Sequence, residues 1–193
     1  MSKTLILAST SPFRAAQLRQ LGLEFETVAP AVDESAHKTE DIAPEELART
    51  LARLKAENVS QTRPDAVVIG SDQVAVCEGE RMGKPGDVER AVQQLSRLQG
   101  KTHSLFTAVC VTYRGEPIEH CDHTRLSMRA LSEEALRRYV VADDPTRCAG
   151  AYKIESRGAA LFEAIETEDP TAIVGLPLFA LVQALEKFGV PVP

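Results

Sequence analysis

A hydroxyl-rich turn that leads into an arginine is the segment of this chain best suited to hold an anion. The stretch Ser9–Arg14 (STSPFR) directly follows the apolar run Leu5–Ala8, which predicts a buried strand. Pro12 suits the first position of a helix, whose unpaired N–H groups attract negative charge. Arg14 shares a helical row with Leu18, so we expect it on the inward stripe, where an arginine needs a charged partner. A capped helix with a surface arginine is the plainer interpretation of these six residues alone.

Two groups of carboxylates have the chemistry of a metal ligand or a general base. Asp72 lies in Gly70–Gln73, at the predicted end of an apolar strand, where half of such aspartates only cap a turn. Asp33 and Glu34 lie in a predicted loop, and a solvated acidic loop is the alternative interpretation. Glu34 and Asp72 together would offer oxygen ligands to one hard divalent cation such as Mg²⁺.

Two lysines, one after each group of carboxylates along the chain, could supply positive charge to the same site. Lys55 follows Leu47 and Leu51 on one face of a predicted helix. The alternative interpretation is that its side chain only extends along the apolar surface and places its ammonium group in solvent. Lys84 lies in the rigid Gly83–Pro85 loop. With Arg14, these lysines would make a cationic cradle for a triphosphate. The sequence alone does not show that the three cations converge.

Alternating strands and helices must position these residues. Strands are predicted at 4–8, 24–28, 66–70, 74–77, 102–113, 117–128 and 158–163, and helices at 12–21, 44–60, 88–98, 132–141 and 176–188. The two long strands that meet at residues 113–116 predict a hairpin. The pattern predicts an α/β fold with a mixed sheet, formed by residues 1–193 as a single domain.

Composition excludes several classes of partner. A net charge of −6 without any basic block argues against binding to nucleic acid or to a membrane surface. No apolar run approaches the roughly 18 residues of a membrane span, and the first one is shorter than a signal segment, so we expect a cytoplasmic protein. The four cysteines lack CxxC spacing and are expected to be reduced and mostly buried. The stretch His120–His123 is expected to be a solvent-facing strand rather than a zinc site.

Common nucleotide-binding and hydrolase motifs are missing, but another set is present. The chain has no GxxxxGK[ST], no GxGxxG after the first strand and no GxSxG. Seven motifs in order along nearly the whole chain instead resemble the Maf family of nucleoside-triphosphate pyrophosphatases. They are SxSPxR at Ser9–Arg14, VDE at Val32–Glu34, Lys55 within LKA, SDQ at Ser71–Gln73, GKP at Gly83–Pro85, AGAYKIE at Ala149–Glu155 and VGLPL at Val174–Leu178.

The resemblance implies a fold, a reaction and residue roles. It implies an elongated mixed sheet flanked by helices, two lobes around a cleft, related to the inosine-triphosphate pyrophosphatase-like folds. It also implies metal-dependent hydrolysis between the α- and β-phosphates, with Mg²⁺ or Mn²⁺ as the cofactor and a nucleoside triphosphate as the small-molecule partner. Carried over by position, Asp72 is the catalytic base and a metal ligand, Glu34 is a second metal ligand, and Ser9, Arg14, Lys55 and Lys84 bind phosphates. A homodimer is the assembly we expect for such a fold.

Three positions separate the subgroups of this family. The pyrimidine group, which takes thymidine and uridine triphosphates, has Arg, Thr and Gln where this chain has Phe13, Gln73 and Glu155. This set resembles the 7-methyl-GTP pyrophosphatase subgroup, whose usual aromatic is tryptophan. An aromatic face attracts the cationic ring of 7-methylguanine by roughly 0.5–2 kcal/mol. Glu155 can accept from the guanine N1–H and N2–H₂ groups. Ser156 and Arg157 depart from the family, in which glycine commonly follows the glutamate.

Three other functions remain open from the sequence. The first is a pyrophosphatase for canonical pyrimidine triphosphates, and the second is one for other modified purines. The third is a nucleotide-binding regulator of cell division without turnover, because the family name derives from septum formation. The Phe13, Gln73 and Glu155 set argues against the first, and the presence of a general base argues against the third.

Overall fold

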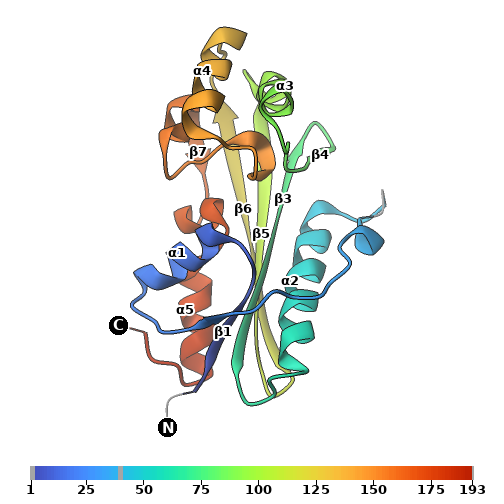
Figure 1. The fold of residues 1–193 in the computed structure, drawn as a ribbon, viewed down its shortest axis with the longest axis vertical. Coiled ribbons are helices and arrows are strands. Elements are labelled where there is room, and N and C mark those ends of the chain that lie inside the picture. The colour runs from blue at the N-terminus through green and yellow to red at the C-terminus, as the bar shows by residue number, and fades with distance from the viewer. Residues whose placement is uncertain (1–2, 39–40, 193) are drawn as a thin grey trace. The chain divides into compact units, whose positions relative to one another are not determined.

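The chain forms two compact units in the computed structural model, which describes residues 3–38 and 41–192 (Figure 1). The first unit contains the described residues of 1–73, 107–122 and 169–193, and the second contains 74–106 and 123–168. Two units agree with the two lobes that the family resemblance implies. The cleft expected with those lobes stays a prediction.

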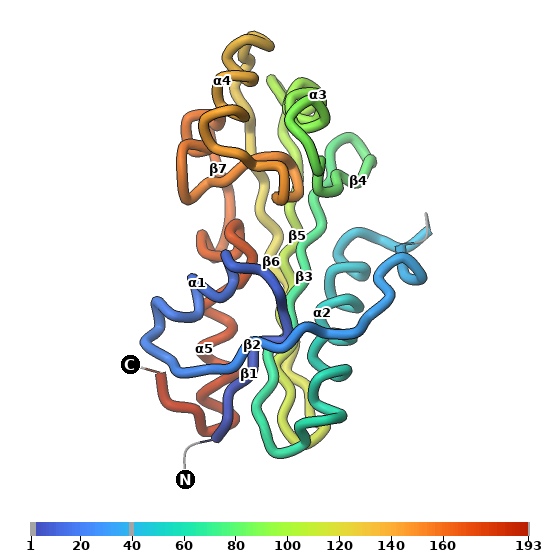
Figure 2. The backbone as a smooth tube through the Cα atoms, viewed as in Figure 1, coloured from blue at the N-terminus to red at the C-terminus, as the bar shows by residue number. Residues whose placement is uncertain are grey.

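A short parallel sheet forms the centre of the first unit. Strand β1 (Leu5–Ala8) pairs in parallel with β2 (Glu26–Thr27) and with the first residues of β3 (Val67–Cys77). All four residues of β1 are buried, as expected for a parallel strand covered on both faces. Helix α2 (Pro44–Ser60) lies on one side of these strands, and α1 (Pro12–Gln20) and α5 (Leu178–Lys187) lie on the other (Figure 2).

The side chains of β1 point alternately to the two faces of the sheet, and each face packs against different helices. Leu5 and Leu7 pack in one cluster with Leu18 of α1 and Leu181 of α5. Ile6, between them, points to the opposite face because successive side chains of a strand alternate. These packed faces fix α1 and α2 against the strands, and both helices carry predicted site residues.

Antiparallel strands and two helices form the second unit. Strand β4 (Glu80–Met82) pairs antiparallel with β3, and β7 (Phe162–Glu166) pairs antiparallel with β6 (Glu116–Met128). Strand β5 (Thr102–Tyr113) lies next to β6, and residues 107–122 of these two strands belong to the first unit. The whole sheet has the order β2-β1-β3-β5-β6-β7, with β4 on β3. Helices α3 (Val88–Leu98) and α4 (Glu133–Asp143) belong to this unit. The predicted α/β class with a mixed sheet is therefore confirmed.

Short 3₁₀ helices occupy the connections. They are η1 (Ser35–His37), η2 (Ala149–Ala151), η3 (Arg157–Leu161) and η4 (Pro170–Val174). In the part of the chain that the structure describes, no helix is both long and apolar enough to cross a membrane.

Four local predictions were wrong. The strands predicted at 66–70 and 74–77 are one continuous strand, β3, so the polar residues between them lie within a strand. The strand predicted at 158–163 begins only at Phe162, after η3. The last helix begins at Leu178 rather than at residue 176, because Pro177 is its N-cap. Asp122, expected on a solvent-facing strand, is buried.

Candidate active site

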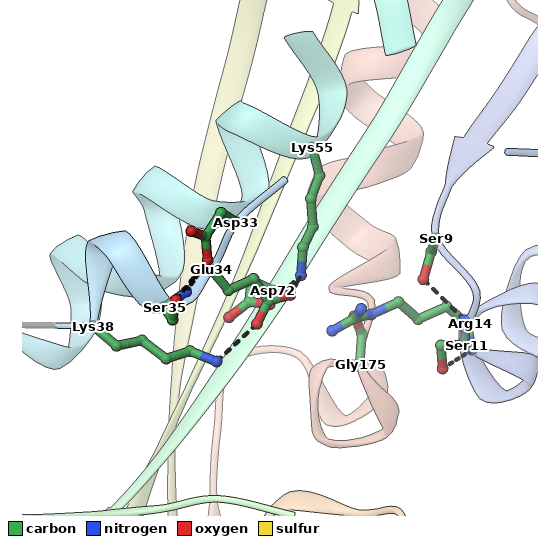
Figure 3. A network of polar contacts seen from close by, with 10 residues as sticks. All are labelled: Ser9, Ser11, Arg14, Asp33, Glu34, Ser35, Lys38, Lys55, Asp72 and Gly175. Carbon is green, nitrogen blue, oxygen red and sulfur yellow. Dashed lines mark hydrogen bonds and ion pairs between the residues drawn. The ribbon is translucent and has the colours of Figure 1, made fainter. Parts of the chain in front are cut away.

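Hydrogen bonds from two serines shape the turn before α1. The Ser11 Oγ atom accepts from the backbone N–H of Arg14 at 3.4 Å and caps the helix, and Pro12 occupies its first turn. The Ser9 Oγ atom accepts from the backbone N–H of Ser11 at 3.1 Å, and Ser9 is buried. The bond to Ser11 uses a lone pair of the Ser9 hydroxyl and not its proton (Figure 3). The predicted strand, turn and helix are confirmed at this segment.

Arg14 is held by a backbone carbonyl rather than by an ion pair at its Nε atom. The Nε atom donates to the Gly175 carbonyl oxygen at 3.0 Å, and Ser71 Oγ donates to the same oxygen at 2.8 Å. Burial lowers the pKa of the guanidinium, while the negative charges of Asp72 and Glu34 raise it. The two carboxylates are therefore close enough to act on Arg14, and its side chain extends toward Asp72 (Figure 3).

A buried lysine joins the two carboxylates that the sequence singled out. Lys55 Nζ lies 2.6 Å from Asp72 Oδ1 and 2.7 Å from Glu34 Oε1. The side chains of Lys55 and Asp72 are only 10% and 12% exposed, so this ion pair is shielded from water. Charges in such surroundings interact more strongly than they do at the surface. The structure thus brings together Arg14, Lys55, Asp72 and Glu34.

Close packing of α2 on β3 places Lys55 beside Asp72. A Cβ atom at Gly70 would lie 2.2 Å from the Ala52 carbonyl oxygen and 2.6 Å from the Ala56 backbone nitrogen. Only glycine therefore allows the helix to approach the strand this closely. Lys55 follows Ala52 by three residues and Asp72 follows Gly70 by two, so the same contact sets both sides of the ion pair. Asp72 lies inside β3 and not at its end, which corrects its predicted position.

Glu34 is shared between two lysines. Its Oε1 atom contacts Lys55 and its Oε2 atom contacts Lys38 at 2.8 Å (Figure 3). Partial burial raises the pKa of Glu34, but the hydrogen bonds and charges of the two lysines outweigh it and lower the pKa to about 2. Glu34 is therefore a carboxylate at any ordinary pH. Neighbouring Asp33 accepts from Ser35 and shapes the loop.

The amide group of Gln73 is fixed by three acceptors. Its Nε2 atom donates within 3.0 Å to Thr107 Oγ1 and to the carbonyl oxygens of Ala172 and Ile173. Backbone carbonyls only accept, which settles the orientation of the amide. The Oε1 atom of Gln73 is then the polar atom that can face a ligand, and it is an acceptor. Phe13 lies in the first turn of α1 and is partly buried.

Lys84 and Glu155 lie in the second unit, and both are exposed. Burial raises the pKa of the Cys148 thiol to about 11, and this thiol also feels the charges of both residues, Glu155 raising the pKa and Lys84 lowering it. The two side chains are thus near one thiol. Their placement beside the first-unit residues stays a prediction.

Hydrogen bonds fix the two loops that carry Lys84 and Glu155. The Gly86 N–H donates to the Thr146 carbonyl oxygen at 2.9 Å, two residues after Lys84. Ser156 Oγ donates to Asp143 Oδ1 at 2.6 Å, at the end of α4. Ser156, which departs from the family pattern, therefore anchors the loop of Glu155.

Comparison with known proteins decides the family. The model of the family described as Maf-like protein matches residues 4–188. The chain belongs to the Maf family. The resemblance found in the seven motifs is therefore confirmed.

Curated relatives of this Maf-family chain share its full length. A 7-methyl-GTP pyrophosphatase of Bdellovibrio bacteriovorus is 46% identical over 96% of this chain and 97% of its own. Proteins of the same name from Xanthomonas axonopodis pv. citri and Xanthomonas oryzae pv. oryzae are 46% and 44% identical, over 98% and 100% of both chains. Among solved structures, a HAM1 protein from Coxiella burnetii aligns over 96% of this chain and 99% of its own, at 15% identity and a TM-score of 0.44.

Sequence reasoning missed several polar partners in this Maf-family chain. The Gly175 carbonyl oxygen accepts from both Arg14 and Ser71, and Lys38 binds Glu34. Ser71 and Gly175 lie inside family motifs and Lys38 lies four residues after one, so only their closeness to a motif in the sequence could have pointed to these residues. Their contacts join residues that are up to 161 positions apart in sequence, and no local pattern encodes such pairs.

Proposed function

We propose that this chain hydrolyses 7-methyl-GTP between its α- and β-phosphates, giving 7-methyl-GMP and pyrophosphate and so clearing a modified nucleotide from the pool. The observation that carries the proposal is the shielded cluster in which Lys55 binds Asp72 and Glu34 beside Arg14. The proposal is supported by full-length relatives of that name at 41–46% identity. The cytoplasm, which holds the nucleotide pool, is the proposed location.

Asp72 is the proposed general base. A water molecule attacks phosphorus, its proton passes to the Asp72 carboxylate, and the bond to the bridging oxygen breaks so that pyrophosphate leaves. Lys55 holds one oxygen of Asp72 and so fixes its orientation. Arg14 and Lys55 supply preorganised positive charge where negative charge develops on the phosphates. Ser9 and Lys84 are the further proposed phosphate ligands.

The carboxylates present fit a divalent cation that arrives with the triphosphate. No group of three or more His, Cys, Asp or Glu side chains suited to a metal occurs in the described residues. Mg²⁺ needs no such group, because it is usually held by one or two carboxylates together with water and substrate phosphates. Glu34 and Asp72, which share Lys55, are the proposed ligands of Mg²⁺ or Mn²⁺. The bound ion would neutralise phosphate charge and orient the substrate.

Three side chains are proposed to select the base. Phe13 offers an aromatic face to the positively charged ring of 7-methylguanine. Gln73 offers its Oε1 acceptor, because its Nε2 atom is committed to the protein. Glu155 is the proposed acceptor for the guanine N1–H and N2–H₂ groups, and its exposed carboxylate suits a cationic base.

Pyrophosphate release from a panel of triphosphates tests the proposal. The panel contains 7-methyl-GTP, GTP, UTP and TTP, each with Mg²⁺ or Mn²⁺. We expect strong preference for 7-methyl-GTP. The Asp72→Asn variant should lose roughly 10²–10⁴-fold in kcat while it still binds nucleotide, because Asn cannot take the proton.

Each other result has a distinct meaning. Preference for UTP or TTP would keep the pyrophosphatase and discard the proposed base selection. No release from any triphosphate at saturating metal would favour a binding protein without turnover. Full activity of Asp72→Asn would show that Asp72 is not the base.

A further inference from the structure

One loop supplies backbone acceptors to two of the proposed binding residues. Residues 169–178, which comprise η4 and the start of α5, contribute the carbonyls of Ala172 and Ile173 to Gln73. The same loop contributes the Gly175 carbonyl to Arg14. The positions of a guanidinium and of an amide therefore depend on the backbone of this loop.

Helix α1 docks on this loop as well. Gln17 Nε2 donates to the Thr171 carbonyl oxygen at 2.7 Å and lies 3.4 Å from the Leu176 carbonyl oxygen. Gln17 is buried and lies one turn after Phe13 on α1. The loop therefore also sets the helix that presents Phe13 and Arg14.

A buried carboxylate ties the two ends of the loop together. Asp169 is only 3% exposed. Its Oδ1 atom accepts from the backbone N–H and the hydroxyl of Thr171, at 2.9 and 2.5 Å. Its Oδ2 atom accepts from the backbone N–H of Phe179 in the first turn of α5, at 2.8 Å. The Thr171 hydroxyl oxygen in turn accepts from the Leu178 N–H at 2.8 Å. Asp169 and Thr171 at the start of the loop therefore both bind backbone N–H groups at its end.

The partners of Asp169 require a carboxylate and not an amide. The Thr171 N–H, the Thr171 hydroxyl and the Phe179 N–H are all donors, and they bind two different carboxylate oxygens of Asp169. In Asp169→Asn, the amide NH₂ would face a donor on one side, and a buried polar group would lose its partner. The side chains keep nearly the same size. The substitution therefore changes the loop's hydrogen bonds with little change in volume.

We propose that Asp169 is a positioning residue for substrate binding, which acts by fixing the backbone of residues 170–178 and through it Arg14, Gln73 and α1. The proposal rests on the proposed function. Asp169 orients the residues that hold the triphosphate and the base, and it does not touch the substrate itself. Its removal should raise KM more than it lowers kcat, because Lys55, Asp72 and Glu34 keep their contacts with one another when the loop shifts.

Steady-state kinetics of Asp169→Asn with 7-methyl-GTP test this role. We expect KM to rise about tenfold with kcat within about threefold of the native value, the signature of lost uniform binding. Thr171→Val should reproduce the effect, whereas Thr171→Ser, which keeps the hydroxyl, should restore the native KM. The double variant Asp169→Asn/Thr171→Val should be no worse than either single change, because both break one network.

A matched stability control separates positioning from simple loss of structure. Ser132→Ala removes the N-cap hydroxyl of α4, whose oxygen accepts from the Ala135 N–H. It should lower the melting temperature of the protein and leave KM unchanged. A native KM in folded Asp169→Asn, or equal effects of Thr171→Val and Thr171→Ser, would overturn the proposal. Should Asp169→Asn not fold, the two Thr171 variants still decide.

Failure of the proposed function would look different. In that case the native protein itself would release no pyrophosphate from 7-methyl-GTP. The same variants are then compared by calorimetric binding of whichever triphosphate of the panel the native protein takes. An affinity loss confined to Asp169→Asn and Thr171→Val would still support the positioning role, and equal affinities would refute it.

Discussion

Lys55 is the central residue of the candidate site because its single ammonium group contacts two carboxylates. The contacts of Lys55 with Asp72 and Glu34 hold the two carboxyl groups close together. A cation that bridges the same carboxylates would share them with Lys55. Further positive charge comes from Arg14 and from Lys38, which contacts the outer oxygen of Glu34.

The ionisation of Glu34 predicts a pH dependence of stability. Although burial opposes it, contact with the lysines lowers its pKa to about 2 in the folded chain. A lowered folded-state pKa stabilises the fold above the unfolded value, and this stabilisation is lost as pH falls toward the folded value. We expect Glu34→Gln to lower the free energy of unfolding at pH 7. The difference from the native protein should shrink steadily below about pH 4.5.

Urea unfolding of both proteins at a series of pH values from 7 to 3 measures this difference. Glu24→Gln removes the same charge from an exposed position outside the cluster and serves as the control. A difference between native protein and Glu34→Gln that stays constant over this range would show that Glu34 gains nothing from Lys55 and Lys38.

Phe13 predicts a selectivity that depends on the charge of the base. In Phe13→Leu an apolar side chain remains, but the aromatic face is lost. The value of kcat/KM for 7-methyl-GTP should fall about 2–30-fold, the equivalent of a cation–π contact of roughly 0.5–2 kcal/mol. The value for GTP, whose ring is neutral, should fall much less. Equal losses for the two nucleotides would mean that Phe13 packs against the protein or the base without sensing the charge.

At the scale of the element, the approach of α2 to β3 decides whether the site forms. In Gly70→Ala the new methyl group meets backbone atoms of Ala52 and Ala56, which cannot rotate away. We expect a loss of about 1–3 kcal/mol in unfolding free energy. We also expect a lower kcat, because α2 must move and carries Lys55 with it.

Gly83→Ala is the stability control, since nothing lies within 4 Å of a Cβ atom there. Urea unfolding and pyrophosphate release are measured on both variants. A Gly70→Ala protein with native stability and native kcat would show that the helix approach does not set the position of Lys55.

Helices and strands could be predicted from the sequence where a single hydrophobic pattern runs through the whole segment. Helix α2 was predicted at its observed bounds, because Pro44 opens it and its leucines recur on one face. Strand β3 was wrongly divided, because Ser71 and Asp72 look like the end of a strand when their partners are unknown. Each finds a distant buried partner, Gly175 and Lys55, and so stays inside the strand.

The candidate site was predictable in its residue types but not in its contacts. The motifs identified Arg14, Lys55, Asp72 and Glu34, and the structure brings them together in the first unit. The sequence shows Asp169 only as a helix N-cap before Pro170, because its contact with the backbone N–H of Phe179 ten residues later involves no side chain of that residue. Backbone partners leave no trace in the residue types around them.

At the scale of the whole molecule, a bound nucleotide should stabilise the fold. The Asp72→Asn variant is suited to show this, because it should bind 7-methyl-GTP without consuming it. A ligand at about 100 times its Kd adds roughly 2.7 kcal/mol to the unfolding free energy. For a chain of 193 residues this corresponds to a rise in Tm of about 5–11 °C.

Two further changes in that variant ask whether both units contribute to binding. Arg14 belongs to the first unit and Lys84 to the second. If both hold phosphates of one nucleotide, Arg14→Ala and Lys84→Ala should each reduce the rise in Tm, because each weakens binding while the nucleotide concentration stays fixed. A full rise in the Lys84→Ala protein would remove Lys84 from the set of phosphate ligands. The first unit alone, with Arg14 and Lys55, would then account for the binding of the triphosphate.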